Sequence, residues 1–337
     1  MSVICNRQAV LDIYEAAGKN GWVLPCICTE NLTTTEAILT AAEEFRVEHN
    51  LDTLPIIIAM TCRYDHRSQA TNYTHTRRWD TGLKLFTESV KVLAGEGGPF
   101  ENLQVMIHLD HIQHDLDTTL LEGDLSDYAS IMYDASTLPL EENIRKTAEF
   151  VAKRGSEIVI EGACDEIVDA VGEARNALTT PENAARFMEL TGADLVVCNL
   201  GTEHRATGKD LQYHGEVSRE IKAVIGEKIV LHGTSSVPND QVAHLYNDGV
   251  CKVNVWTALE RDATPILFDD MVRHAREVAN KATVDKLVAD GYLTEKANTD
   301  QPVNIAHFTT LYRQTIIFEE MKKAVRDYLD LWYPVSK

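Results

Sequence analysis

The chain has 337 residues, of which 44% are hydrophobic and 25% charged, a composition typical of a soluble globular protein. Its formal net charge of −20 argues against a nucleic-acid partner, because phosphate backbones are bound by Lys and Arg. No apolar run approaches the ~20 residues that a membrane-spanning helix requires. The N-terminal residues lack the pattern of a signal peptide, and the seven cysteines are an odd number. We therefore expect a cytoplasmic protein with neither a membrane nor a nucleic-acid partner.

Eight apolar segments of strand length are distributed along the chain. They cover residues 22–28, 54–60, 104–111, 128–133, 157–161, 194–198, 228–232 and 249–255. Segments with helical periodicity alternate with them, and no dinucleotide-binding or Walker motif is present. Eight strand–helix units favour an α/β fold of the closed (β/α)8 type, the TIM barrel, over an open sheet. We expect residues 1–283 to form this barrel, and residues 284–337 to be a helical extension that packs on the barrel or on a partner subunit.

Polar residues directly follow several of the apolar segments. The third segment ends in His108-Leu109-Asp110-His111, and His204 and His232 follow or end the sixth and seventh. The C-terminal ends of all strands surround one mouth of a barrel, so these side chains are expected to lie together. Three neutral imidazoles are a typical zinc site with an open position for water or substrate. The alternative is that one or two of them are ordinary loop histidines.

The tripeptide Gly233-Thr234-Ser235 follows the seventh apolar segment and suggests a phosphate site. Glycine lets backbone N–H groups approach an anion, and a hydroxyl adds a hydrogen-bond donor. Tripeptides of this kind are also common turns, so the tripeptide by itself does not distinguish a phosphate site from a turn.

Five motifs resemble, in the same order along the chain, those of the class II (zinc-dependent) ketose-bisphosphate aldolases, the fructose- and tagatose-bisphosphate type. The motifs are His108–His111, Ser130–Asn143, Gly201–His204, Leu231–Pro238 and Gly249–Thr257. The resemblance implies an enzyme that cleaves or forms a carbon–carbon bond in a ketose (bis)phosphate or a related anionic ketose. Cleavage passes through an enediolate that a metal ion stabilises, and it yields dihydroxyacetone phosphate, or a similar ketone, and an aldehyde.

The resemblance also implies roles for individual residues. His111, His204 and His232 would hold one Zn²⁺ per subunit, with Glu161 either behind these ligands or as an alternative metal ligand, and Asp110 would be the acid/base group at the aldehyde carbonyl. The residues that would hold the phosphate and the ketone end of the substrate are Asn31, Thr61, Gly233, Ser235, Asn254 and Thr257. The resemblance further allows a monovalent cation and implies a homodimer or homotetramer.

The chain departs from the family pattern in three places. Residues 163–173 lack the second Glu of the family and the acidic loop that carries the proton-abstracting Glu, which leaves Glu166 or Glu173 as the candidates for that role. Arg205 replaces a glycine near the phosphate, where it either reaches an anionic substrate or is solvated. Ser236 replaces another glycine. Together these changes predict a diverged member with an altered substrate.

Two alternative functions remain compatible with the same residues. A metal-dependent sugar or sugar-phosphate epimerase or isomerase would reprotonate the enediolate rather than cleave the substrate, and the altered acidic loop is the reason to consider it. A binding barrel without catalysis is the lesser alternative, because Asp110 and the three histidines are retained.

Overall fold

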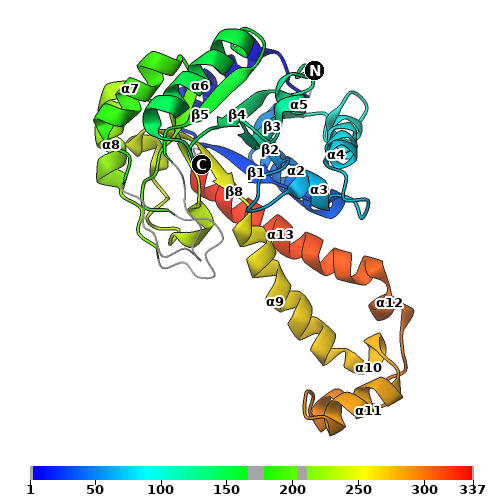
Figure 1. Cartoon of the computed structure of the whole chain (residues 1–337). Coiled ribbons are helices and arrows are strands. Elements are labelled where there is room, and N and C mark those ends of the chain that lie inside the picture. The colour runs from blue at the N-terminus through cyan, green and yellow to red at the C-terminus, as the bar shows by residue number, and fades with distance from the viewer. Residues whose placement is uncertain (1–2, 166–177, 203–210, 336–337) are drawn as a thin grey trace.

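A closed barrel of eight parallel strands forms the body of the protein (Figure 1). The computed structural model describes residues 3–165, 178–202 and 211–335. The strands are β1 (Leu24–Cys28), β2 (Leu54–Thr61), β3 (Leu103–Gln113), β4 (Ser130–Asp134), β5 (Val159–Ala163), β6 (Leu195–Val197), β7 (Ile229–Leu231) and β8 (Val250–Val255). They follow one another around the barrel in chain order, and β8 pairs with β1. Each predicted apolar segment contains or overlaps one strand, so the predicted TIM barrel is confirmed.

Helices surround the strands and continue beyond the last of them (Figure 1). The first eight are α1 (Arg7–Lys19), α2 (Leu32–Glu48), α3 (Gln69–Asn72), α4 (Trp79–Ala94), α5 (Thr118–Leu121), α6 (Leu140–Arg154), α7 (Pro181–Thr191) and α8 (Gly215–Ile225). After β8 come α9 (Thr257–Arg273), α10 (Ala275–Val278), α11 (Lys281–Ala289), α12 (Ile305–Phe308) and α13 (Thr310–Trp332). Short 3₁₀ turns are η1 (Thr234–Ser236), η2 (Leu245–Asp248) and η3 (Glu295–Ala297). None of the described helices combines the length and apolar character needed to cross a bilayer.

The third strand contains a β-bulge at the mouth of the barrel. Leu109 pairs with Ile131 and Ile112 pairs with Tyr133, so two residues of β3 face a single residue of β4. His111 has a φ of 47°, in the left-handed region that residues other than glycine seldom adopt. In a regular strand successive side chains point to opposite faces, whereas a bulge redirects them. The bulge is what allows both Asp110 and His111 to face the same site.

The outer part of α9, the short helices α10 to α12 and the beginning of α13 project from the barrel as an arm, here residues 266–312 (Figure 1). The arm has a small core of its own, made of Ala275, Val284 and Ala297 with partly buried neighbours. The predicted extension, residues 284–337, therefore begins within the arm and ends on the barrel.

The end of α13 is anchored at the N-terminal ends of the first two strands. The indole N–H of Trp332 donates to the carbonyl of Val242 at 2.9 Å, and the Tyr333 hydroxyl donates to the carbonyl of Pro55 at 2.7 Å. Both aromatic side chains are almost completely buried, and Val23 N–H donates to the carbonyl of Trp332. The C-terminal segment thus completes the core at the end of the barrel opposite the predicted site.

Replacement of Trp332 by Ala should lower the free energy of unfolding by about 3–5 kcal/mol, because it leaves a cavity and removes a buried hydrogen bond. Urea unfolding monitored by circular dichroism measures this change. Asp327→Ala on the exposed face of the same helix is the control, with an expected change within about 0.5 kcal/mol. Equal effects of the two substitutions would contradict the anchoring role of Trp332.

Candidate active site at the barrel mouth

Most of the predicted site residues that the structure describes line one pocket at the C-terminal ends of the strands. These are Thr61, Asp110, His111, His232, Gly233, Ser235, Asn254 and Thr257. The pocket is completed by Cys28, Tyr64, His66, Arg67, Gln69, Val255 and Trp256. Residues that lie far apart in the sequence are therefore brought together as the barrel mouth requires.

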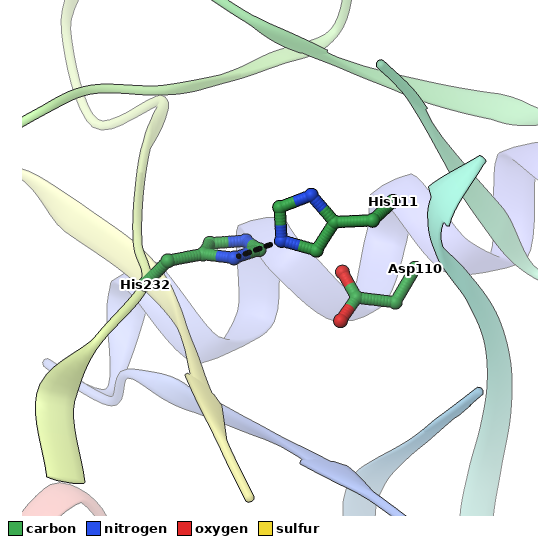
Figure 2. A group of neighbouring side chains, drawn as sticks. All are labelled: Asp110, His111 and His232. Carbon is green, nitrogen blue, oxygen red and sulfur yellow. Dashed lines mark hydrogen bonds between the residues drawn. The ribbon is translucent and has the colours of Figure 1, made fainter. Parts of the chain in front are cut away.

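Two histidines and one aspartate lie next to each other in this pocket (Figure 2). Nε2 of His111 lies 3.1 Å from Nδ1 of His232, and the two rings are almost perpendicular. Each of Asp110, His111 and His232 offers a ligand atom, and these atoms lie within 4.8 Å of one another. The three residues are at least 95% buried, so protein atoms surround the group on most sides.

Asp134, which the sequence placed only in a family motif, orients His111. Nδ1–H of His111 donates to a carboxylate oxygen of Asp134 at 2.8 Å, which leaves Nε2 turned towards His232. Asp134 also accepts hydrogen bonds from Ser136 N–H and its hydroxyl. A carboxylate that fixes the far nitrogen of a ligating histidine is a regular feature of metal sites.

The electrostatics of the pocket favour a positive charge between these residues. Burial disfavours the charged form of Asp110, but His111 and His108 hold the pKa of Asp110 well below its usual range. Burial likewise opposes protonation of His111, yet the carboxylates of Asp110 and Asp134 raise the pKa of this histidine. Burial dominates at His232, where the pKa is lowered.

The donor atoms fit a zinc ion. Two ligands at about 2.0–2.1 Å in tetrahedral geometry lie roughly 3.3 Å apart, and the facing nitrogens of His111 and His232 are 3.1 Å apart. One of these nitrogens needs a proton to hydrogen-bond with the other, whereas a divalent cation would engage both. Nitrogen donors beside a carboxylate are the ligand set that zinc commonly takes.

Glu161 lies behind His232 and is paired with a lysine that the sequence prediction missed. Lys252 donates to Oε2 of Glu161 at 2.7 Å, and the other carboxylate oxygen lies 3.5 Å from Nε2 of His232. Burial raises the pKa of Glu161, but Lys252 and the neighbouring histidines lower it overall to about 2. Lys252 also donates to Nε2 of His108 at 3.1 Å, and Nδ1–H of His108 donates to Ser130. This buried ion pair lies next to His232, which was predicted as a metal ligand.

Asp110 is held at the pocket by its neighbours. The Asn254 side chain donates to one carboxylate oxygen at 2.9 Å, and the Cys28 thiol donates to the other at 3.3 Å. His108 lies 3.7 Å from the same carboxylate. Asn254 was predicted as a substrate residue, and the structure adds that it orients Asp110.

The predicted phosphate side of the pocket is built from Gly233, Ser235 and the first turn of α9. Gly233 has a φ of 68°, which favours glycine, and it opens the 3₁₀ turn η1. The Ser235 hydroxyl accepts a hydrogen bond from the N–H of Ala258, and Arg261 donates to the Ser235 carbonyl. Helix N-termini present unpaired N–H groups to anions, and α9 begins at Thr257 beside the pocket.

The loop after β2 supplies pocket residues that were not among the predicted site residues. The Tyr64 ring stacks on His111 with a centroid separation of 4.3 Å. Arg67 pairs with the Glu30 carboxylate, and its guanidinium lies over the Trp256 ring at 4.4 Å. The Thr61 hydroxyl donates to the Arg67 carbonyl, so this predicted substrate residue also holds the loop in place.

The remaining predicted residues lie elsewhere or outside the described residues. Asn31 caps α2, where its side-chain oxygen accepts from Thr34 N–H at 2.9 Å, and it is not among the residues that line the pocket. Four further candidates fall outside the described ranges: Glu166, Glu173, His204 and Arg205. Their assignments stay predictions.

Residues 8–330 match the family model described as "Fructose-bisphosphate aldolase class-II". The chain belongs to this family. The fructose-bisphosphate aldolase of Campylobacter jejuni superposes with a TM-score of 0.75 at 18% identity, covering 98% of this chain and 95% of that one. The YdjI aldolase of Escherichia coli K12 gives a TM-score of 0.63 at 19% identity, with 95% and 94% covered. The structural likeness supports the shared fold, and membership in the class II family supports an aldolase.

The buried Lys252–Glu161 pair leads to a stability prediction. Lys252→Met alone should lower the free energy of unfolding by about 3–5 kcal/mol, because Glu161 then remains buried without its partner. The double variant Lys252→Met/Glu161→Leu should recover much of this loss, since no unpaired charge remains. Urea unfolding of metal-free protein measures both variants. The single variant Glu161→Leu is measured as well. A double variant whose loss of unfolding free energy equals the sum of the two single losses would contradict the pairing.

Proposed function

We propose that this chain is a zinc-dependent aldolase that acts on a phosphorylated or otherwise anionic ketose. The products are dihydroxyacetone phosphate, or a similar three-carbon ketone, and an aldehyde. The observation that carries the proposal is the group of His111, His232 and Asp110 at the barrel mouth of a class II family member. Cytoplasmic localisation belongs to the same proposal.

His111 and His232 are the proposed zinc ligands, together with His204 from the part of the chain that is not described. When bound, the ion supplies Lewis-acid stabilisation of the enediolate oxygens. Asp134 keeps the Nε2 lone pair of His111 available by accepting its Nδ1–H. Glu161 lies 3.5 Å from Nε2 of His232, the nitrogen that faces away from His111, and is proposed to orient this ring or to serve as an alternative metal ligand. A monovalent cation remains an expectation from family resemblance.

Asp110 is the proposed acid/base group for the aldehyde half of the substrate. In the direction of cleavage, its carboxylate takes the proton from the hydroxyl of the carbon that becomes the aldehyde. In the direction of synthesis, the carboxyl group returns this proton to the aldehyde oxygen. Asn254 and Cys28 hold the carboxylate by hydrogen bonds, which keeps it oriented before substrate enters. Glu166 or Glu173 is the proposed base for the second proton.

The proposed anion site consists of Gly233, Ser235, Thr257 and the N-terminus of α9. Thr61 and Asn254, which line the pocket, would contact the ketone end of the substrate. Asn31 remains a substrate residue only as an expectation from the family resemblance, because its side chain caps α2. Arg67 lines the same pocket and is already oriented by Glu30 and Trp256. Arg67 and Arg205 are therefore the proposed cations for a second anionic group of the substrate.

Replacement of His232 by Ala should abolish zinc binding at the barrel mouth, whereas Asp110→Ala should retain zinc and lose turnover by about 10²–10⁴-fold. Elemental analysis measures the zinc. Mass spectrometry of zinc-loaded protein, incubated with phosphorylated and unphosphorylated ketoses, measures release of the aldehyde. The matched control is His49→Ala, which changes a histidine at the end of α2, away from the pocket.

The same experiment distinguishes the alternative functions. A new ketose isomer without aldehyde would identify an epimerase or isomerase, and it would contradict the aldolase proposal. Zinc-loaded protein that leaves every ketose unchanged would favour the binding barrel. Wild-type protein that binds no zinc would contradict the proposed metal dependence.

We further propose that the chain forms a homodimer or homotetramer through the arm. The arm exposes several large apolar side chains: Ile266, Phe268, Tyr292, Ile305, Phe308 and Leu311. Such a concentration of exposed apolar side chains is typical of an interaction surface. Light scattering should therefore give a mass of two or four chains, and Phe268→Glu should shift the mass towards one chain. Wild-type protein that is monomeric at all concentrations would contradict the proposal.

A further inference from the structure

Two histidines and a glutamate lie together in the arm. Their helices, α10 and α12, lie away from the barrel mouth (Figure 1). His274 connects the end of α9 to α10, Glu277 lies on α10, and His307 lies on α12. Each offers a ligand atom, and these atoms lie within 4.8 Å of one another. The cluster therefore brings His307 next to two residues that precede it in the sequence by 30 and 33 positions.

The backbone positions the cluster before any ligand is considered. The N–H of Asn304 donates to the carbonyl of Glu277 at 2.9 Å, which places α12 beside α10. The rings of His274 and His307 are stacked with a centroid separation of 4.7 Å and an angle of 24°. All three side chains are partly buried, so their freedom is limited and their outer edges remain accessible.

His274 has the tautomer that a metal ligand needs. Its Nδ1 lies 2.9 Å from the carbonyl oxygen of Asp270 and 3.1 Å from the Asp270 carboxylate, so Nδ1 carries the proton and donates it. Nε2 is then left with a lone pair. The Asp270 carboxylate is itself fixed by the Tyr312 hydroxyl. In zinc sites, a ligating histidine commonly donates the N–H of its other ring nitrogen to a carboxylate, as His274 does here.

His307 and Glu277 face each other without a well-aligned hydrogen bond. Nδ1 of His307 lies 3.1 Å from Oε2 of Glu277, yet this buried nitrogen has no hydrogen bond of good geometry to any described residue. Two donors on one zinc ion at about 2.0–2.1 Å lie roughly 3.3 Å apart, which is close to this separation. The separation of the pair is that of an ion pair, and it also fits two ligands of one ion.

We propose that His274, Glu277 and His307 form a second divalent-metal site, for zinc, with Asp270 as the residue that positions His274. Two histidines and a glutamate are an established zinc ligand set, and nitrogen with carboxylate donors select zinc over calcium or magnesium. The net charge of −20 attracts cations generally. The ion would join α10 to α12.

A metal at this place has a structural consequence because the core of the arm is small. Its buried apolar residues are Ala275, Val284 and Ala297, of which two are alanines. Metal binding adds free energy directly to the folded form when the ligands come together only on folding. Zinc would therefore stabilise the arm independently of the barrel, and this inference does not depend on the proposed catalytic function.

Zinc content of the full-length protein tests the site. The His232→Ala variant removes the ion proposed for the barrel mouth, so the zinc that remains should be one per chain and belong to the arm. Adding His307→Ala or Glu277→Gln to this variant should remove that zinc, with unchanged circular dichroism as the check on folding. His214→Ala in the same background is the matched control, because His214 also lies 3.1 Å from a glutamate, Glu216. It should leave one zinc per chain.

Limited proteolysis provides a second readout. In the His232→Ala background, zinc at about 100 times its dissociation constant should slow cleavage within residues 278–304 about 100-fold, if cleavage requires opening of the arm. The effect should disappear with His307→Ala and persist with His214→Ala. A His232→Ala protein without zinc would overturn the proposal. Zinc content or proteolysis that is the same with and without His307 would overturn it as well.

Discussion

The bulge in β3 is the constraint on which the arrangement of the mouth depends. Strand geometry alternates side chains between the two faces, so a regular strand could direct Asp110 or His111 into the pocket, but not both. The extra residue and the left-handed backbone at His111 remove this limitation. Asp134 on β4 then accepts the Nδ1–H of His111 and fixes the ring. Strain at one backbone position is thus compensated by a buried charge-assisted hydrogen bond.

The interior of the barrel next to these residues contains buried charged side chains as well as apolar ones. Lys252 is completely buried, and its ammonium is shared between Glu161 and His108. Burial lowers the pKa of Lys252, but Glu161 and Asp110 are among the groups that raise it overall, so the ammonium stays charged. Buried ions are costly unless each is paired, and this pairing makes the interior specific for one arrangement of its side chains. Hydrogen bonds of Lys252 to Glu161 and His108 therefore link β8 to β5 and β3 next to the site.

Much of the fold was accessible from the sequence because parallel strands buried on both faces are continuous apolar runs, as in residues 54–60. Asp110, His111 and His232 were accessible because they end such runs. The bulge was not, since it depends on the pairing of β3 with β4 and not on composition. Lys252 was noted only as part of a motif, because a lysine inside a strand gives no indication of its partner across the barrel. The roles of Tyr64 and Arg67 depend on how a loop folds over the mouth, and the cluster in the arm depends on the contact between α10 and α12.

Helix α9 connects the mouth of the barrel to the arm, and α13 leads from the arm back to the barrel. It is 17 residues long, about 25 Å, and begins beside Ser235 while its other end lies in the arm. Pro265 interrupts its hydrogen-bond ladder between these two parts and provides a point where the helix can bend. Contacts that fix the arm also restrict the first turn of α9, because both belong to one helix. The rigidity of the pocket therefore depends in part on the packing of the arm.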